Sequence, residues 1–264
     1  MNYEAICEGT REIVRETGIF IQEEAKNFKR ESVEFKGLHN LVSYVDKSAE
    51  EKLVAGLRKV LPEAGFITEE ETTTERGTMN WIIDPLDGTT NFIHGLPVYS
   101  ISIALHDGKE LVCGVVHELN LDECFYTWKG APSFMNGTEI HVSAAKNINE
   151  SLLATGFPYY DFALQEKYMA LLNELIRKSE GVRRLGSAAV DLVYTAAGRF
   201  DAYYEYNVNA WDIAAGAIIV QNAGGFATDF GGENGFLDKR EIVCANPAVH
   251  AELLDVIKKH FAES

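Results

Sequence analysis

The sequence predicts an α/β fold, with some α+β character, in which layers of helix alternate with layers of sheet. Three features of the 264-residue chain lead to this prediction. Apolar side chains recur at helical spacing near the start, a β-rich stretch runs from Val98 to Thr127, and strands and helices are mixed after it. Elements in this order are typical of sheets with helices between and outside them.

Two helices are expected before the first strand. From residue 3 to about residue 29, apolar side chains recur every three or four positions with charged residues between them, which is typical of an amphipathic helix. A second helix is predicted from Asp46 or Ser48, either of which would cap it, to Val60. A proline two positions later would end it.

Short strands are expected next. The stretches "GFIT" at 65–68 and "MNWIID" at 79–84 are apolar, and each leads directly into carboxylates. The β-rich stretch then contains "VYSISIAL", "ELVCGVVHEL" and "ECFYTW", and the first two are separated by an Asp-Gly turn. Turns of this kind join antiparallel neighbours, so the stretch predicts a meander.

The second half of the chain is expected to mix both element types. The predicted strands are 151–156, 201–205, 224–230 and 242–245, and the predicted helices are 161–178, 187–197, 211–222 and a final one from Pro247. No repeat or linker divides these elements.

Composition limits the function. Forty acidic side chains against 24 basic ones give a net charge of −16, which repels nucleic acid, so no direct nucleic-acid binding is expected. The same charge would repel a phosphorylated substrate, so cations would have to mediate that contact. The four cysteines are widely spaced, which predicts reduced thiols and no zinc site. With no signal peptide and no bilayer-spanning stretch, we expect a cytoplasmic protein without a membrane contact.

Two aspartates stand three positions apart in the stretch "WIIDPLDGTTNF". Pro85 disfavours the helical conformation for Asp84, so we expect Asp84 to end its strand and the chain to turn directly afterwards. Gly88 permits a tight backbone, and Asp84 and Asp87 can then converge. Two carboxylates about 5 Å apart repel by roughly 3 kcal/mol at an effective dielectric of about 20, so convergence predicts a cation between them. Oxygen donors select Mg²⁺, Mn²⁺ or Ca²⁺ over zinc or copper.

The alternative is an ordinary Asp-rich turn followed by a helix cap. Two further carboxylates at element boundaries favour the metal site: Glu69 follows a predicted strand, and Asp212 opens a predicted helix. Asp212 by itself is also explained as a charge that favours the positive end of a helix. From these residues alone, both interpretations remain open.

A phosphate site would use the same segment. A helix that begins at Thr89 would offer unpaired backbone amides to a phosphate. Metal ions on one side and amides on the other suit hydrolysis of a phosphomonoester by a metal-activated water. The Thr89 hydroxyl, backed by a carboxylate such as Asp46, could orient that water.

Three motifs in order carry a resemblance to a known family. "WIIDPLDGTTNF", "GVRRLGSAAVDLVYTAAGRFDAYYE" and "WDIAAGAIIVQNAGG" resemble the signatures of the inositol monophosphatase family, within the Mg²⁺-dependent, lithium-sensitive phosphatases. The resemblance covers most of the chain. It implies an αβαβα sandwich of the kind shared with fructose-1,6-bisphosphatase, formed by one domain over 1–264, with an N-terminal part to about 145 and a C-terminal part from about 146. It also implies a homodimer.

The resemblance implies roles for particular residues. The metal ligands would be Glu69, Asp84, the carbonyl of Leu86, Asp87 and Asp212. Water activation would fall to Glu69, Thr89 and Asp46. Phosphate and sugar contacts would come from Gly88, Thr89, Gly186, Ser187, Ala188 and Glu205. Because three glutamates run together at 69–71, Glu70 remains an alternative ligand to Glu69.

The implied cofactor is Mg²⁺, two or three ions per site, with Mn²⁺ able to substitute and with Li⁺ and Ca²⁺ inhibitory. A lysine-containing hairpin serves the family as a lid, and it would correspond here to Lys36 in "FKGLHNLVSYVD". The alternative for this segment is an ordinary surface loop.

The implied reaction is hydrolysis of myo-inositol 1-phosphate, a small phosphorylated polyol, to inositol and phosphate. "DGTTNF" and Glu205 favour this branch, but related enzymes act on fructose 1,6-bisphosphate, 3′-phosphoadenosine nucleotides or histidinol phosphate, and these stay open. Haloacid dehalogenase phosphatases place their aspartates at i and i+2, whereas the spacing here is i and i+3. A regulatory binding protein on the same fold is a further alternative, because similar bacterial proteins associate with the transcription machinery.

Overall fold

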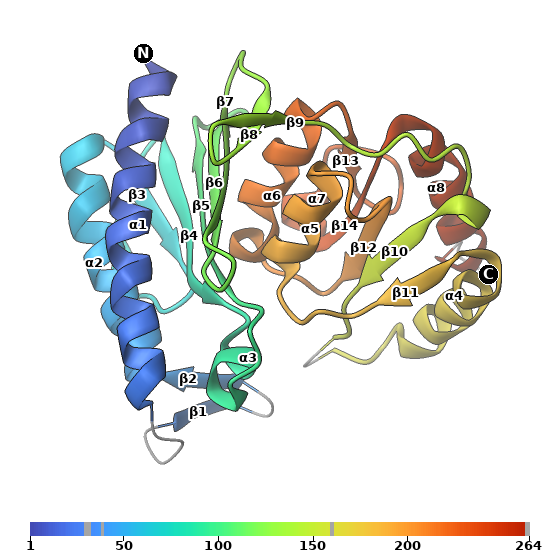
Figure 1. Cartoon of the computed structure of the whole chain (residues 1–264), viewed down its shortest axis with the longest axis horizontal. Coiled ribbons are helices and arrows are strands. Elements are labelled where there is room, and N and C mark those ends of the chain that lie inside the picture. The colour runs from blue at the N-terminus through green and yellow to red at the C-terminus, as the bar shows by residue number, and fades with distance from the viewer. Residues whose placement is uncertain (29–32, 38–39, 159–160, 262–264) are drawn as a thin grey trace.

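The computed structural model describes residues 1–28, 33–37, 40–158 and 161–261. Helices and sheets alternate in five layers (Figure 1). The outer helices α1(Tyr3–Asn27) and α2(Tyr44–Val60) cover one sheet, and α4(Gln165–Lys178) and α8(Pro247–Phe261) cover the other. Between the two sheets lie α5(Ala188–Ala196) and α6(Ala210–Asn222). This arrangement confirms the layered αβαβα fold expected from the sequence.

The first sheet has seven strands in the order β3-β4-β5-β6-β7-β8-β9. The strand β3(Gly65–Thr68) runs parallel to β4(Asn80–Asp87), and all later neighbours are antiparallel. The remaining strands are β5(Ser100–His106), β6(Leu111–Glu118), β7(Glu123–Trp128), β8(Ser133–Met135) and β9(Thr138–Ile140). The predicted meander is therefore confirmed, and it is extended by two three-residue strands that the sequence did not predict.

The second sheet has five strands in the order β11-β10-β12-β14-β13. The strand β10(Leu152–Thr155) is parallel to both β11(Gly181–Arg183) and β12(Ala202–Tyr206). The strand β14(Glu241–Ala245) is antiparallel to β12 and to β13(Phe226–Thr228). Helices between the parallel strands are the expected crossover connections.

Smaller elements complete the chain. The strands β1(Val33–Gly37) and β2(Asn40–Ser43) form an antiparallel hairpin beside α3(Thr89–His94). The lid predicted around Lys36 falls on this hairpin, but the Lys36 side chain lies outside the described part of the chain. A 3₁₀ turn, Ile148–Glu150, and the short α7(Phe236–Lys239) were not predicted.

The start of α2 differs from the sequence prediction. Ser43 is the N-cap, because its hydroxyl oxygen accepts a hydrogen bond from Val45 N at 3.1 Å. The Asp46 carboxylate reaches back to accept Ser43 N at 2.8 Å, so Asp46 occupies the third position of a capping box. Neither Asp46 nor Ser48 is the cap, and the helix begins two residues earlier than expected because a serine in extended conformation precedes it.

Three apolar clusters hold the layers together. One joins α1 and α2 to the first sheet, one fills the space between the two sheets, and one joins the second sheet to α4 and α8. The helix α6 is buried from Ile213 to Val220, as expected for a helix with a sheet on either side. In the described part of the chain, no helix has both the length and the apolarity needed to cross a bilayer.

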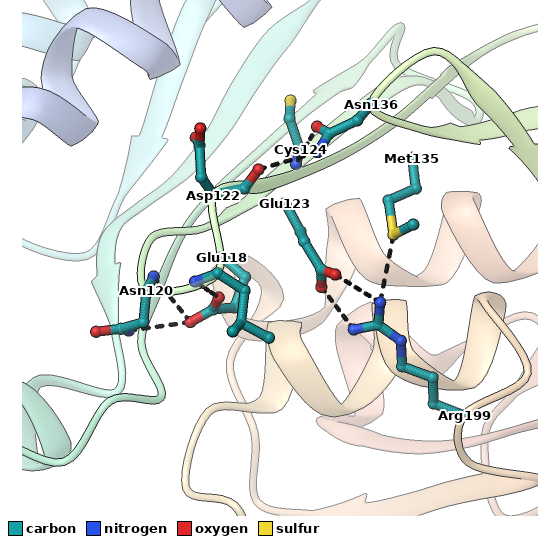
Figure 2. A network of polar contacts seen from close by, with 9 residues as sticks. Glu118, Asn120, Asp122, Glu123, Cys124, Met135, Asn136 and Arg199 are labelled. Carbon is teal, nitrogen blue, oxygen red and sulfur yellow. Dashed lines mark hydrogen bonds and ion pairs between the residues drawn. The ribbon is translucent and has the colours of Figure 1, made fainter.

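A polar network connects the two halves at the turn between β6 and β7 (Figure 2). Arg199 follows α5 in the chain, and its guanidinium group donates to both carboxylate oxygens of Glu123 on β7 at 2.5 and 2.6 Å. The buried Glu118 carboxylate accepts the backbone amides of Asn120 and Leu121 at 3.1 and 2.6 Å. Asn136 accepts the Cys124 amide at 2.9 Å, which ties the turn after β8 to β7.

Candidate active site

A bulge in β4 explains why the two aspartates are three positions apart. Asp84 pairs with Ser102 on β5 and Asp87 pairs with Ser100, so three steps along β4 match two along β5. One extra residue therefore sits in β4, at the stretch that contains Pro85, which has no amide to donate to the ladder. In a regular strand, residues i and i+3 face opposite sides. The extra residue restores Asp84 and Asp87 to the same side.

The turn expected directly after Asp84 is therefore wrong. The strand continues through Pro85 to Asp87, and the chain turns only at Gly88. Gly88 has φ +93°, and a Cβ there would lie 2.9 Å from the carbonyl oxygen of Val98, so glycine is required on two counts. The predicted helix α3 then starts at Thr89.

Glu69 reaches the same place from the neighbouring strand. β3 is parallel to β4 with Thr68 opposite Ile83, and Glu69 N donates to the carbonyl of Ile83 at 3.2 Å. Glu69 is thus placed beside Asp84. Of the three consecutive glutamates, only Glu69 borders the central cavity among the described residues.

A buried glutamate that the sequence analysis missed fixes the segment after Glu69. Glu50 on α2 is fully buried. Its carboxylate accepts the amides of Glu70 and Thr72, both at 2.8 Å, and the Thr72 hydroxyl at 2.7 Å. A Glu in the middle of an amphipathic helix gives no sequence signal that it is buried.

Asp212 arrives from the second half of the chain. It stands at the third position of α6, where its carboxylate accepts Asn209 N at 2.6 Å. The start of α6 is tied to β5, because the Ser102 hydroxyl donates to the carbonyl of Trp211 at 3.2 Å. Since Ser102 pairs with Asp84, this bond places Asp212 near the bulge.

The residues predicted to hold metal ions all line one cavity: Glu69, Asp84, Leu86, Asp87 and Asp212. The Thr89 hydroxyl oxygen lies 2.9 Å from the carbonyl oxygen of Leu86, and Leu86 N donates to Asp84 at 2.9 Å. Segments from the first sheet and from α6 therefore meet at this point.

The carboxylates raise one another's pKa. The pKa of Asp84 is raised well above its usual value, first by burial and then by Glu69, Asp87 and Asp212. Burial raises the pKa of Asp87 to about 6 against the opposing hydrogen bonds from Ser187 and Ala189. Burial and the neighbouring Asp87 raise the pKa of Asp212 to about 7. Without a compensating cation, this cluster is electrostatically unfavourable when fully ionised.

The chemistry of these donors fits a hard divalent cation. All are oxygens, as Mg²⁺ and Mn²⁺ prefer, and their mutual repulsion would be relieved by positive charge. They do not form a ready coordination shell: within the described ranges, no group of three or more His, Cys, Asp or Glu side chains is arranged to hold a metal ion. Asp87 and Asp212 are instead bonded to protein donors, Ser187 and Asn209 respectively.

Thr89 and Asp46 form a pair at the edge of the cavity. The Thr89 hydroxyl lies 2.9 Å from Oδ1 of Asp46, and the other Asp46 oxygen accepts the Ser43 amide and hydroxyl. Asp46 is almost fully buried, and burial raises its pKa although the bonds from Ser43 and Thr89 oppose that change. Thr89 lines the cavity and Asp46 lies behind it.

The residues predicted to contact phosphate and sugar also border this cavity: Gly88, Thr89, Gly186, Ser187, Ala188 and Glu205. The Ser187 hydroxyl donates to Asp87 at 2.5 Å, and Ala189 N donates to the same oxygen at 2.7 Å. Ser187 is also the N-cap of α5. The start of α5 therefore holds Asp87 in place.

Glu205 lies on β12 and borders the same cavity. Its carboxylate accepts the Tyr203 hydroxyl at 2.5 Å, and burial raises its pKa to about 8. A Cβ on Gly156 would lie 2.1 Å from that carboxylate, so glycine at 156 is what leaves room for it. Glu205 was predicted from the sequence, whereas Gly156 was not.

Further residues on the cavity wall were not predicted, among them Arg184, Asp191 and Asn207. Asp191 is 1% exposed, and its pKa is raised well above the usual value by burial and then by Glu205 and Asp87. An acidic residue inside the otherwise apolar stretch "AAVDLV" is the signal that could have identified it. Asn207 left no such signal.

A family model and several known proteins match this chain in sequence. A model of the inositol monophosphatase family matches residues 2–262. The chain is 40% identical to a protein of Neisseria meningitidis serogroup B named putative Nus factor SuhB, over 93% of this chain and 95% of that protein. It is 38% identical to an inositol-1-monophosphatase of Mesorhizobium japonicum, over 86% of each chain.

Solved structures share the fold. The extragenic suppressor protein suhB of Bartonella henselae superposes with a TM-score of 0.90 at 34% identity, covering 97% of this chain and 99% of that one. The Thermotoga maritima IMPase superposes with a TM-score of 0.86 at 35% identity, covering 94% and 95% respectively. The fold class predicted from the sequence is thereby confirmed a second time.

Proposed function

The chain belongs to the inositol monophosphatase family, and on this premise we propose that it is a Mg²⁺-dependent phosphomonoesterase that hydrolyses myo-inositol 1-phosphate to inositol and phosphate. One observation carries the proposal: the four carboxylates of Glu69, Asp84, Asp87 and Asp212, from three segments of the chain, border a single cavity beside the partly buried Thr89–Asp46 pair. Such a cavity suits a negatively charged substrate that binds together with divalent cations.

Glu69, Asp84, the carbonyl of Leu86, Asp87 and Asp212 are the proposed metal ligands. We expect two or three Mg²⁺ ions per site, with Mn²⁺ able to substitute and Li⁺ and Ca²⁺ inhibitory. When bound, Mg²⁺ supplies charge neutralisation at the phosphate and lowers the pKa of water. The acidic protein carries a net charge of −16 and offers few other positive groups for that purpose.

Thr89 is proposed to orient the attacking water. When its hydroxyl proton points to Oδ1 of Asp46, a lone pair of Oγ1 is left to accept a hydrogen bond from water. Asp46 stays in place because Ser43 bonds its second oxygen. Glu69, beside Asp84, is the proposed base, and it would accept the second hydrogen bond that the water donates.

The remaining residues would hold the two ends of the substrate. The amides of Gly88 and Thr89, at the start of α3, are proposed to contact the phosphate. Gly186, Ser187, Ala188 and Glu205 would contact the inositol ring. The relative from Mesorhizobium japonicum that carries the name inositol-1-monophosphatase supports this substrate. Fructose 1,6-bisphosphate, 3′-phosphoadenosine nucleotides and histidinol phosphate are the alternatives within the superfamily.

A phosphate-release assay over these esters tests the proposal. With Mg²⁺ we expect the highest kcat/KM for inositol 1-phosphate, loss of activity on chelation, and inhibition by Li⁺ and Ca²⁺. Higher turnover of a nucleotide 3′-phosphate would refute the narrower assignment. Light scattering tests the homodimer proposed with this activity, and fractionation tests the proposed cytoplasmic location.

A second candidate function is a regulatory binding role. It is favoured by the relative named putative Nus factor SuhB, at 40% identity over almost the whole chain. The Asp84→Asn variant separates the two roles, because it removes a proposed metal ligand inside the cavity without changing the surface. A cellular phenotype that Asp84→Asn rescues as well as the wild type does would favour the binding role.

A further inference from the structure

Two polar side chains on the cavity wall lack hydrogen-bond partners. Asp191, on α5, is 1% exposed, and its Oδ1 atom has no partner within the described structure. Asn207 lies between β12 and α6, and its Nδ2 atom also has no hydrogen-bond partner within the described structure. Both residues border the same cavity as Glu205.

Polar atoms of this kind destabilise the folded protein unless a bound molecule forms the missing hydrogen bond. A buried donor or acceptor left without a partner loses the hydrogen bond that it made to water. Asp191 offers an acceptor and Asn207 a donor, and these are the two functions of a hydroxyl group. A ligand with hydroxyl groups can therefore satisfy both residues.

The backbone conformation of Asn207 is a second reason to expect that its side chain has a role in the cavity. Its φ is +59°, in the left-handed region that glycine adopts at no cost. Asparagine is tolerated there better than most residues, but glycine would still be the simplest choice. The side chain at this position borders the cavity two residues after Glu205.

The rest of the wall indicates which ligands fit. No aromatic ring lines the cavity in the described part of the chain, so a nucleobase would find no stacking surface there. Besides the proposed metal ligands, the cavity wall carries the polar side chains of Arg184, Asp191, Glu205 and Asn207. A polar wall of this kind suits an alcohol with several hydroxyl groups.

We propose that Asp191 and Asn207 bind hydroxyl groups of the alcohol half of the substrate, and so select phosphorylated polyols over phosphomonoesters that lack free hydroxyls. This inference rests on the phosphatase function proposed above. It assigns specificity to two residues that do not touch the phosphate. Their contribution should therefore depend on which ester is hydrolysed.

The experiment compares myo-inositol 1-phosphate with phenyl phosphate, which has no hydroxyl group. Asn207→Gly is the main variant, because glycine accepts the left-handed backbone without strain. We expect the ratio of kcat/KM for the two esters to fall about tenfold, the equivalent of one hydrogen bond of about 1.4 kcal/mol, mainly through KM for the inositol ester. Asp191→Asn should lower the same ratio.

Asn136→Gly is the matched control. Asn136 has a left-handed φ of +48°, but it lies in the turn between β8 and β9, where it bonds Cys124 and Asp122 (Figure 2). This substitution should cost stability and leave the ratio at its wild-type value. The inhibition constant of inorganic phosphate, measured for every variant, reports on the phosphate half alone.

Two results would overturn the inference. One is an unchanged ratio in both Asn207→Gly and Asp191→Asn; the other is a change in phosphate inhibition as large as the change in the ratio. Failure of the proposed function looks different, because the wild-type protein would then hydrolyse neither ester in the presence of Mg²⁺.

Discussion

The hydroxyl of Thr89 lies 2.9 Å from Oδ1 of Asp46, although 43 positions separate the two residues in the chain. The contact joins the start of α3 to the start of α2. Asp46 takes part at both helix starts, because it bonds Thr89 and also completes the capping box of its own helix. Helix initiation and the proposed water-orienting pair therefore depend on one carboxylate.

Replacing Thr89 tests that pair. Thr89→Val keeps the shape of the side chain and removes the hydroxyl, so we expect kcat with inositol 1-phosphate to fall by about 10²-fold or more, in the range of general acid–base contributions. Thr89→Ser retains the hydroxyl and should keep most of the activity. Equal losses in Val and Ser variants would show that the hydroxyl is not what matters. Steady-state kinetics with Mg²⁺ in excess measure the effect.

The bond from Ser187 to Asp87 predicts an effect on metal affinity. Ser187→Ala removes one of the two protein donors that hold Asp87 Oδ2, while Ala189 N remains. Loss of a residue that orients a metal ligand costs about 10- to 100-fold in affinity or activity. We expect a higher Mg²⁺ concentration for half-maximal activity, with kcat recovered at saturation. Calorimetric titration with Mn²⁺ gives an independent measurement, and an unchanged affinity would contradict the assignment of Asp87.

Removing a carboxylate from the cavity should stabilise the protein when no metal is present. Asp84 is buried among Glu69, Asp87 and Asp212, which raise its pKa. Asp84→Asn removes the unfavourable charge, so we expect Tm in chelator to rise by about 3 °C or more, which corresponds to roughly 1 kcal/mol for a chain of this size. Added Mg²⁺ should reverse the order, because it stabilises the wild type and not the variant. A lower Tm for the variant in chelator would contradict this account.

The raised pKa values also predict how stability changes with pH. In the folded protein the pKa of Asp87 is about 6, that of Asp212 about 7 and that of Glu205 about 8, all above the values of unfolded carboxylates. Between about pH 4 and pH 8 the folded state therefore binds more protons than the unfolded state, and these groups lower the free energy of unfolding as pH rises. Urea denaturation in chelator should show this decline.

Two comparisons test whether Asp87, Asp212 and Glu205 cause this decline in the free energy of unfolding. Glu205→Gln should flatten the upper part of the profile, between about pH 5 and pH 8, because it removes the group with the highest pKa of the three. Saturating Mg²⁺ should flatten the part that comes from Asp87 and Asp212. A profile in chelator that rises over the whole range would contradict the sign.

Much of the fold was predictable because long elements carry a strong apolar period. The helices that became α1, α6 and α8 and the strands of the meander were found within a few residues of their bounds. The strands β8, β9 and β11 are three residues long, too short for any period to appear. The N-cap Ser43 was missed because three polar residues, all suitable as caps, lie within six positions.

The candidate site was predictable to the extent that its residues form motifs. Asp84, Asp87, Thr89 and Asp212 lie in short stretches whose spacing is informative, and all four reach the cavity or its edge. Glu50 and Asn207 have no local signature, since their importance depends on contacts made across the fold. The bulge in β4 depends on pairing with β5 and was equally invisible from the aspartate segment alone.

The bulge also limits how the pairing of β4 can change. If β4 kept its present length and paired with β5 without the bulge, Asp87 would face the opposite side of the sheet from Asp84. Deleting Pro85 or Leu86 would instead leave the two aspartates two positions apart in a regular strand, where they still face the same side. A slip of one residue in the strand pairing, rather than the loss of one residue, is therefore the change that would separate the two carboxylates.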